Sequence, residues 1–95
     1  MNEIFDVTVV INNNQDLKYV MNSDTKIKPY ITIYDERYLE DKKKAYSIKN
    51  EYGARETPFV LILKNGKYLK AFWKESNKDP IKELIDFLNE KDTLN

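Results

Sequence analysis

The chain has 95 residues, which is the size of one domain with a modest core. It contains no cysteine and no histidine, so disulfides, thiol redox chemistry, zinc fingers and imidazole catalysis lack their atoms. The 16 basic and 16 acidic side chains give a formal net charge of zero, which argues against nucleic acid as a partner. No segment has the length of a transmembrane helix or the pattern of a signal peptide. We therefore expect a cytoplasmic protein without membrane association, metal or cofactor.

The first half of the chain predicts two strands and two helices. Phe5 to Ile11 is a β-branched run of strand length, and three asparagines follow it. Apolar side chains at helical spacing then predict a short helix from about Gln15 to Asn22. Tyr30 to Tyr34 is rich in aromatic and β-branched residues and predicts a second strand. Leu39 to Tyr52, followed by a glycine, predicts the second helix.

The second half predicts a hairpin and the clearest helix. Phe59 to Leu63 is continuously apolar, as expected of a strand that is covered on both faces. Asn65-Gly66 predicts a tight turn into an antiparallel strand from Tyr68 to Trp73. Asp79-Pro80 supplies a cap and a first-turn proline for a helix with regular apolar spacing. We expect residues 91–95 to form a frayed tail after this helix, so that residues 1–95 make a single domain.

Three groups of side chains allow a functional or a structural interpretation. Acidic residues cluster at Asp35, Glu36, Glu40 and Asp41. They fit no EF-hand loop, and we interpret them as helix-entry acids that favour the positive end of a helix dipole. We interpret most of the tyrosines as core or half-buried residues whose hydroxyl groups reach water. Phe72 and Trp73 are neighbours on a strand, so they must point to opposite faces of the sheet.

The predicted order β-α-β-α-β-β-α and one stretch of sequence resemble the thioredoxin-like fold. Residues 51–67, EYGARETPFVLILKNGK, are similar to the thioredoxin stretch in which a helix ends in Tyr-Gly, a loop reaches Thr-Pro, and an apolar strand leads to Asn-Gly-Lys. The resemblance implies an α/β domain with a central mixed sheet of about four strands flanked by helices. It also implies that the Thr57-Pro58 bond is cis, and that Thr57 presents its backbone to an extended substrate strand.

The redox motif of that family is missing from this chain. In thioredoxins a Cys-x-x-Cys motif follows the first strand of this unit, and the matching residues here are Asn12, Asn13, Asn14, Gln15 and Asp16. Disulfide exchange needs a thiolate, so thiol-disulfide oxidoreductase activity is excluded and we expect no catalytic residue. Beside the expected cis proline the family keeps small residues, whereas this chain has Glu56 and, at the end of the last strand, Trp73 and Lys74.

These features favour a non-catalytic thioredoxin-fold module that binds another protein or a peptide. Its expected contact surface combines residues 12–16, Glu56, Thr57-Pro58, Trp73 and Lys74. One alternative is a small-molecule or peptide binder, or an enzyme, that uses the cis-proline groove without thiol chemistry. Another is a structural or regulatory accessory subunit whose contact lies on a helix or a sheet edge. The bias toward lysine and asparagine is typical of AT-rich coding, as in a low-GC bacterium, its phage or another mobile element.

Overall fold

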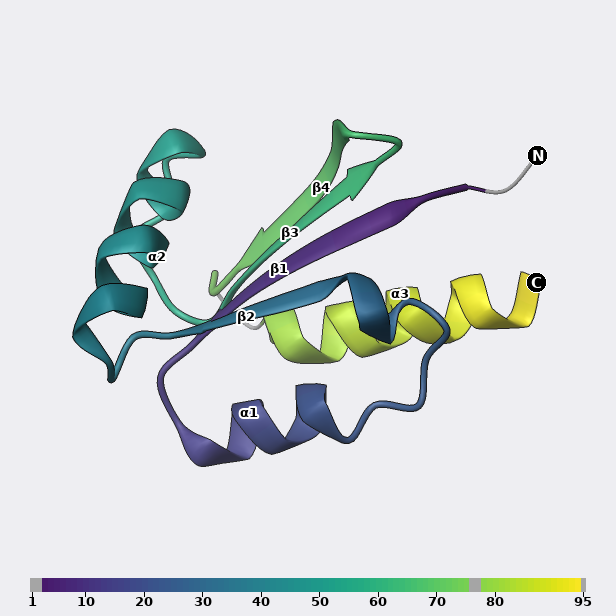
Figure 1. Ribbon diagram of the computed structural model, residues 1–95, viewed down its shortest axis with the longest axis horizontal. Coiled ribbons are helices and arrows are strands. Elements are labelled where there is room, and N and C mark those ends of the chain that lie inside the picture. The colour runs from purple at the N-terminus through teal and green to yellow at the C-terminus, as the bar shows by residue number, and fades with distance from the viewer. Residues whose placement is uncertain (1–2, 76–77, 95) are drawn as a thin grey trace.

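A four-stranded mixed sheet with helices on both faces forms the body of the protein (Figure 1). The structure is a computed structural model, and it describes residues 3–75 and 78–94. Its elements are, in chain order, β1 (Phe5–Ile11), α1 (Asn14–Met21), the 3₁₀ turn η1 (Lys28–Tyr30), β2 (Ile31–Asp35), α2 (Leu39–Glu51), β3 (Phe59–Lys64), β4 (Lys67–Trp73) and α3 (Pro80–Leu94). The predicted α/β class, with a mixed sheet flanked by helices, is confirmed.

The strand order across the sheet is β2-β1-β3-β4. β1 pairs in parallel with β2, because α1 returns the chain along one face of the sheet, and it pairs antiparallel with β3. β3 and β4 form a hairpin whose two-residue turn, Asn65-Gly66, has φ angles of 51° and 80°. Asparagine and glycine tolerate this left-handed region, so the predicted tight turn forms here. The first strand of the chain therefore lies in the interior of the sheet.

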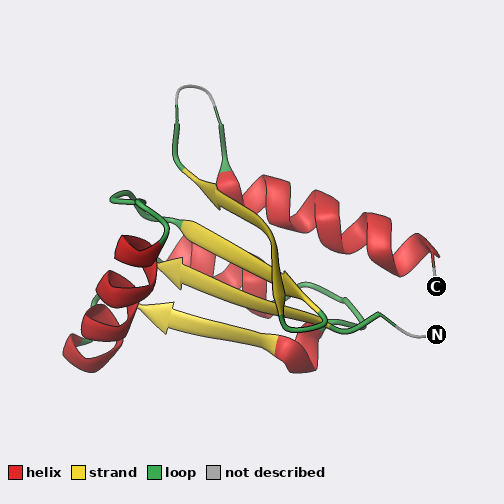
Figure 2. Ribbon diagram, turned by 90° about the horizontal axis from the view of Figure 1, so that it is seen from above, coloured by secondary structure: helices red, strands yellow, loops and turns green. Residues whose placement is uncertain are grey.

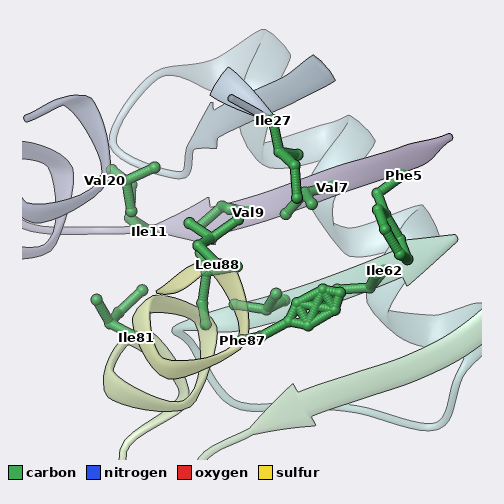
Figure 3. Packing of buried hydrophobic residues seen from close by; sticks show 12 residues of the cluster. Phe5, Val7, Val9, Ile11, Val20, Ile27, Ile62, Ile81, Phe87 and Leu88 are labelled. Atoms are coloured by element: carbon green, nitrogen blue, oxygen red, sulfur yellow. The ribbon is translucent and has the colours of Figure 1, made fainter. Parts of the chain in front are cut away.

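α1 and α3 cover one face of the sheet, and α2 lies over the other face at one end of the strands (Figure 1 and Figure 2). The larger core lies on the α1 and α3 side. Alternate residues of β1 and helically spaced residues of α3 meet there: Phe5, Val7, Val9, Ile11, Ile81, Leu84, Phe87 and Leu88 (Figure 3). The two periodicities, 2 for the strand and 3.6 for the helix, explain why the sequence predicts both elements.

A smaller core lies between the sheet and α2. Its buried members are Val10, Ala45, Ala54, Phe59 and Leu61. The ring centroid of Phe59 lies 6.3 Å from that of Tyr52 and 6.2 Å from that of Trp73. Trp73 packs against this cluster, whereas Phe72 packs against the larger core on the other face. The prediction that Phe72 and Trp73 point to opposite faces is confirmed, and both side chains are half-buried.

The last helix is longer than predicted. α3 continues to Leu94, so the prediction of a frayed tail is wrong for residues 91–94, while Asn95 lies outside the described residues. Asp92 accepts hydrogen bonds from Thr25 Oγ1 (3.2 Å) and Lys26 N (3.1 Å), which ties the last turn to the loop before η1. No helix in the described part of the chain is long and apolar enough to cross a bilayer.

The interpretation of most tyrosines as buried or half-buried is wrong. More than half of the surface of five of the seven is exposed: Tyr19, Tyr30, Tyr38, Tyr46 and Tyr68. Tyr34 and Tyr52 are half-buried, as expected, because both lie under or beside α2. The exposed tyrosines lie at element ends or on the outer sides of α1 and α2, which face away from the core.

Candidate functional site

The strand ends meet at one edge of the sheet, which we call the carboxyl edge because β1 and β2 end there. A lateral row of paired residues marks it: Tyr34, Val10, Phe59 and Trp73. Asn12 follows β1, Pro58 precedes β3 and Lys74 follows β4, so the structure brings three predicted segments to the same edge. In open α/β sheets, ligands bind outside the carboxyl ends of strands where the chain changes direction across the sheet.

The segment that matches the redox motif forms the cap of α1. Asn13 has an extended backbone, and its Oδ1 accepts a hydrogen bond from Asp16 N at 2.8 Å. Its Nδ2 donates to Asp16 Oδ2 (3.0 Å) and to Asn12 Oδ1 (3.2 Å). These bonds satisfy a free amide of the first helical turn, as an N-cap does. The side chain of Asn13 therefore caps α1. Asn12, Asn14 and Gln15 are exposed beside it.

An ion pair ties the end of β2 to this cap. The guanidinium of Arg37 donates from Nε and Nη2 to the carboxylate of Asp35, with a shortest distance of 2.7 Å. The Nη1 of Arg37 donates to Asn14 Oδ1 at 2.8 Å. Asp35 is only 6% exposed, and the hydrogen bonds from Arg37 hold the pKa of its carboxyl below the usual range. Arg37 thus fixes the first residue of α1 relative to β2.

A second ion pair holds the loop before β3. Lys49 is only 7% exposed, and its Nζ donates to Glu36 Oε1 and to Thr57 Oγ1, both at 2.8 Å. The hydroxyl of Thr57 also contacts Glu36 Oε1. The three side chains come from α2, from the end of β2 and from the loop that leads into β3. The hydroxyl group of Thr57 is therefore held in place by the buried Lys49 and the half-buried Glu36.

The backbone of Thr57 contrasts with its side chain. The Thr57-Pro58 peptide bond is cis, as the resemblance implies. Within the described residues, no backbone hydrogen bond uses the N–H or the C=O of Thr57. Glu56 beside it is exposed, and Thr57 and Pro58 are half-buried. The loop thus offers one donor and one acceptor at the carboxyl edge, on a segment whose side chain is fixed.

The structure corrects the interpretation of the acidic cluster. Glu40 and Asp41 do lie in the first turn of α2, as predicted. Asp35 and Glu36 do not act as helix-entry acids, because each forms an ion pair at the end of β2. Across residues 3–75 and 78–94, no three acidic side chains are placed to hold a metal ion. The spacing of Asp35 and Arg37 at a strand end is a signal from which the first ion pair could have been predicted. Lys49 carries no such signal, because it is one of several lysines on α2.

A groove opens from the carboxyl edge between α1 and α3. Its volume is about 980 Å³, and Gln15 and Asp16 of α1 lie at its head. Ile81, Ile85 and Leu88 of α3 form the apolar part of its wall. The groove is large enough for a small molecule, since ligand pockets usually span about 300 to 1,000 Å³.

The ion pair of Asp35 predicts a specific dependence of stability on pH. The folded-state pKa of Asp35 lies below its ordinary value of about 3.9, so the pair stabilises the fold fully above about pH 5 and loses this contribution as the pH falls below 4. We expect Asp35→Asn to lower the urea midpoint at pH 7, and the gap to wild type to shrink at pH 3. A gap of the same size at both pH values would contradict the assignment.

No protein-family model matches the chain, and no curated protein matches its sequence. The function of the carboxyl edge must therefore follow from its own groups. These are two ion pairs, a helix cap and a stretch of backbone without hydrogen bonds to other described residues.

Proposed function

We propose that this protein is a thioredoxin-like module without redox activity that binds an extended segment of a partner protein at the carboxyl edge. The element order, the mixed sheet with helices on both faces and the cis Thr57-Pro58 bond support the thioredoxin-like arrangement. The chain lacks the sulfur that disulfide exchange requires. The residues at the head of α1 then serve as a surface for contact instead of a reactive centre.

The unbonded backbone of Thr57 carries this proposal. An extended peptide can donate to its C=O and accept from its N–H, as an added strand does at a sheet edge. Lys49 and Glu36 hold the Thr57 side chain before a partner arrives. A segment that is already ordered loses less conformational entropy on binding, so this loop is better suited to a partner than a free loop would be.

The neighbours of Thr57 define what the partner meets. Trp73 lies at the end of the paired strand β4 and stacks on Phe59 with a centroid distance of 6.2 Å. Its half-buried indole offers an aromatic surface beside the loop, and aromatic side chains are enriched in binding hot spots. Glu56 and Lys74 are exposed on either side and set the charge preference. The side-chain amides of Asn12 and Asn14 supply further polar contacts.

A peptide selected against the folded protein tests the proposal. Ten-residue peptides from a displayed random library that bind the protein should shift the backbone amide signals of Thr57 and of residues 12–16. They should also change the emission of Trp73, the single tryptophan of the chain. We expect Glu56→Lys to change the affinity of such a peptide about tenfold or more, because it reverses a charge beside the paired backbone.

The matched control is Glu90→Lys, which makes the same charge change at an exposed position of α3. This variant should bind the selected peptide as the wild type does. Peptides whose amide shifts lie elsewhere, or that are insensitive to Glu56→Lys, would contradict a binding site at Thr57.

The groove between α1 and α3 favours a second candidate, a small-molecule binder. Its volume of about 980 Å³ and its mixed lining fit an amphiphilic molecule of metabolite size. A thermal-shift screen of metabolites separates the two candidates. Stabilisation by a compound whose signals map to Tyr19 and Ile85 would favour the groove over the Thr57 loop.

A further inference from the structure

The two edge strands of the sheet, β2 and β4, differ in how many of their outer backbone groups form hydrogen bonds. β2 forms one edge, and its outer groups are largely satisfied at both ends. The N–H of Ile31 donates to Lys28 O, and the N–H of Asp35 donates to Asp41 Oδ2 at 3.1 Å. The C=O of Asp35 accepts from Tyr38 N at 3.0 Å. Both ends of β2 are thus engaged, which leaves the outer backbone groups of Ile33 and the C=O of Ile31 for another strand to pair with.

The β4 edge is open. The N–H of Asn65 donates to Ile4 O, which lies on the β1 side. Backbone N–H and C=O groups point to alternate sides along a strand, so those of Val60 point toward β4. Val60 and its partner Phe72 therefore exchange backbone hydrogen bonds. The N–H and C=O groups of Ala71 and Trp73 therefore point away from β3. Apart from the pairing with β3, no described residue forms a backbone hydrogen bond with β4. The outer side of β4 is thus available to a further strand.

The open edge carries unpaired positive charge. Lys67, Lys70 and Lys74 are all exposed, and none of them forms an ion pair with another described residue. In the pairing of β3 with β4, Lys67 lies opposite Lys64 and Lys70 lies opposite Ile62. Ile62 belongs to the larger core, and Lys64 is two residues further along the same strand, so both lysines lie on the face that α3 covers. The whole chain has no net charge, so this row is a local excess.

A hollow lies beside the same edge. Its volume is about 220 Å³, and Ala71, Phe72 and Trp73 of β4 form one wall. Glu75, Lys78 and Glu83 form the rest of its lining, and Glu75 and Lys78 approach each other at 3.9 Å. Two carboxylates and one ammonium group thus line the hollow beside β4, while Lys67, Lys70 and Lys74 lie outside this lining. An incoming strand finds room here next to Ala71 and Trp73.

We propose that β4 accepts an acidic, extended segment of a partner protein as a fifth strand of the sheet. Backbone hydrogen bonds to Ala71 and Trp73 would supply the pairing, and glutamate or aspartate side chains would face Lys67, Lys70 and Lys74. A second copy of this chain is the less suitable occupant, because pairing β4 with itself brings two rows of lysines together, and like charges on adjacent strands repel. This surface shares Trp73 and Lys74 with the proposed Thr57 site, but it does not use the backbone of Thr57.

A designed peptide tests the proposal. The probe is a capped ten-residue peptide of alternating glutamate and threonine, and a peptide with lysine in place of glutamate is its counterpart. We expect the acidic peptide alone to bind and to slow amide hydrogen exchange at Ala71 and Trp73. Exchange at Phe72 should stay unchanged, because this N–H already bonds to β3. Reversing both charges, Lys67→Glu with Lys70→Glu, should weaken binding about tenfold and favour the lysine peptide.

The control is Lys42→Glu with Lys43→Glu, which reverses two exposed charges on α2 and should leave affinity within about twofold. Equal binding of both peptides, protection elsewhere in the chain, or no binding at millimolar peptide would overturn the proposal. Protection of Ala71 and Trp73 that rises with protein concentration alone would overturn the assignment to an acidic partner, because it identifies a second copy on this edge. None of these variants changes Thr57, so failure here leaves the binding site at Thr57 untouched.

Discussion

Lys49→Met is expected to lower the free energy of unfolding by about 3 kcal/mol. The ammonium group of Lys49 is the buried partner of the Glu36 carboxylate and also holds the Thr57 hydroxyl. Methionine keeps most of the volume of the lysine stem but leaves Glu36 without its counter-charge in a partly buried position. Urea unfolding followed by circular dichroism at pH 7 measures the loss.

Two further variants separate the ion pair from packing. Lys44→Met, at an exposed position of the same helix, should change stability by less than about 0.5 kcal/mol. Combining Lys49→Met with Glu36→Gln should recover much of the loss, since no charge is then left unpaired. If Lys49→Met alone is as stable as the wild type, the pair does not hold the loop before β3.

Phe59→Ala is expected to destabilise the protein by about 4 kcal/mol, the larger of the two effects. Phe59 is fully buried, and its ring lies between those of Tyr52 and Trp73. It also occupies the middle of the lateral row at the carboxyl edge. Alanine leaves a cavity under α2, and the rigid strands on either side limit how far the structure can collapse into it.

Tyr68→Ala is the matched control for Phe59→Ala. Tyr68 also stacks on Tyr52, with a centroid distance of 5.7 Å, but 58% of its surface is exposed. Its loss should cost about 1 kcal/mol, the usual range for an exposed aromatic pair. Thermal unfolding of both variants under the same conditions gives the comparison. Equal losses would contradict the assignment of Phe59 to the core of the α2 side.

The elements that the sequence predicts well have strong local causes. β1 begins and ends where the β-branched run does, and the Asn65-Gly66 turn forms because its residues tolerate positive φ. α3 begins at Pro80 after its aspartate cap, as predicted. Its end was predicted too early, because the last turn depends on Asp92 reaching Thr25, a contact between segments far apart in the chain.

The same distinction applies to the carboxyl edge. The resemblance to the thioredoxin-like fold predicts that Thr57-Pro58 and residues 12–16 share one surface, and the strand order brings both segments to the carboxyl edge. The two ion pairs could not be foreseen in this way. Lys49 is one of several lysines on α2, and only the three-dimensional fold shows that it is buried against Glu36. Whether a charged side chain is solvated or paired is decided by neighbours that are distant in sequence.

The interior position of β1 has a consequence for how the protein is made. β1 is synthesised before both of its neighbours in the sheet, and one of them, β3, follows only after α1, β2 and α2. The larger core closes only when α3, the last element, supplies Ile81, Leu84 and Leu88. Contacts of such long sequence separation slow folding and delay it until most of the chain is available. During synthesis the apolar face of β1 therefore stays uncovered until α3 has been made, and chaperones have the most time to act on this strand.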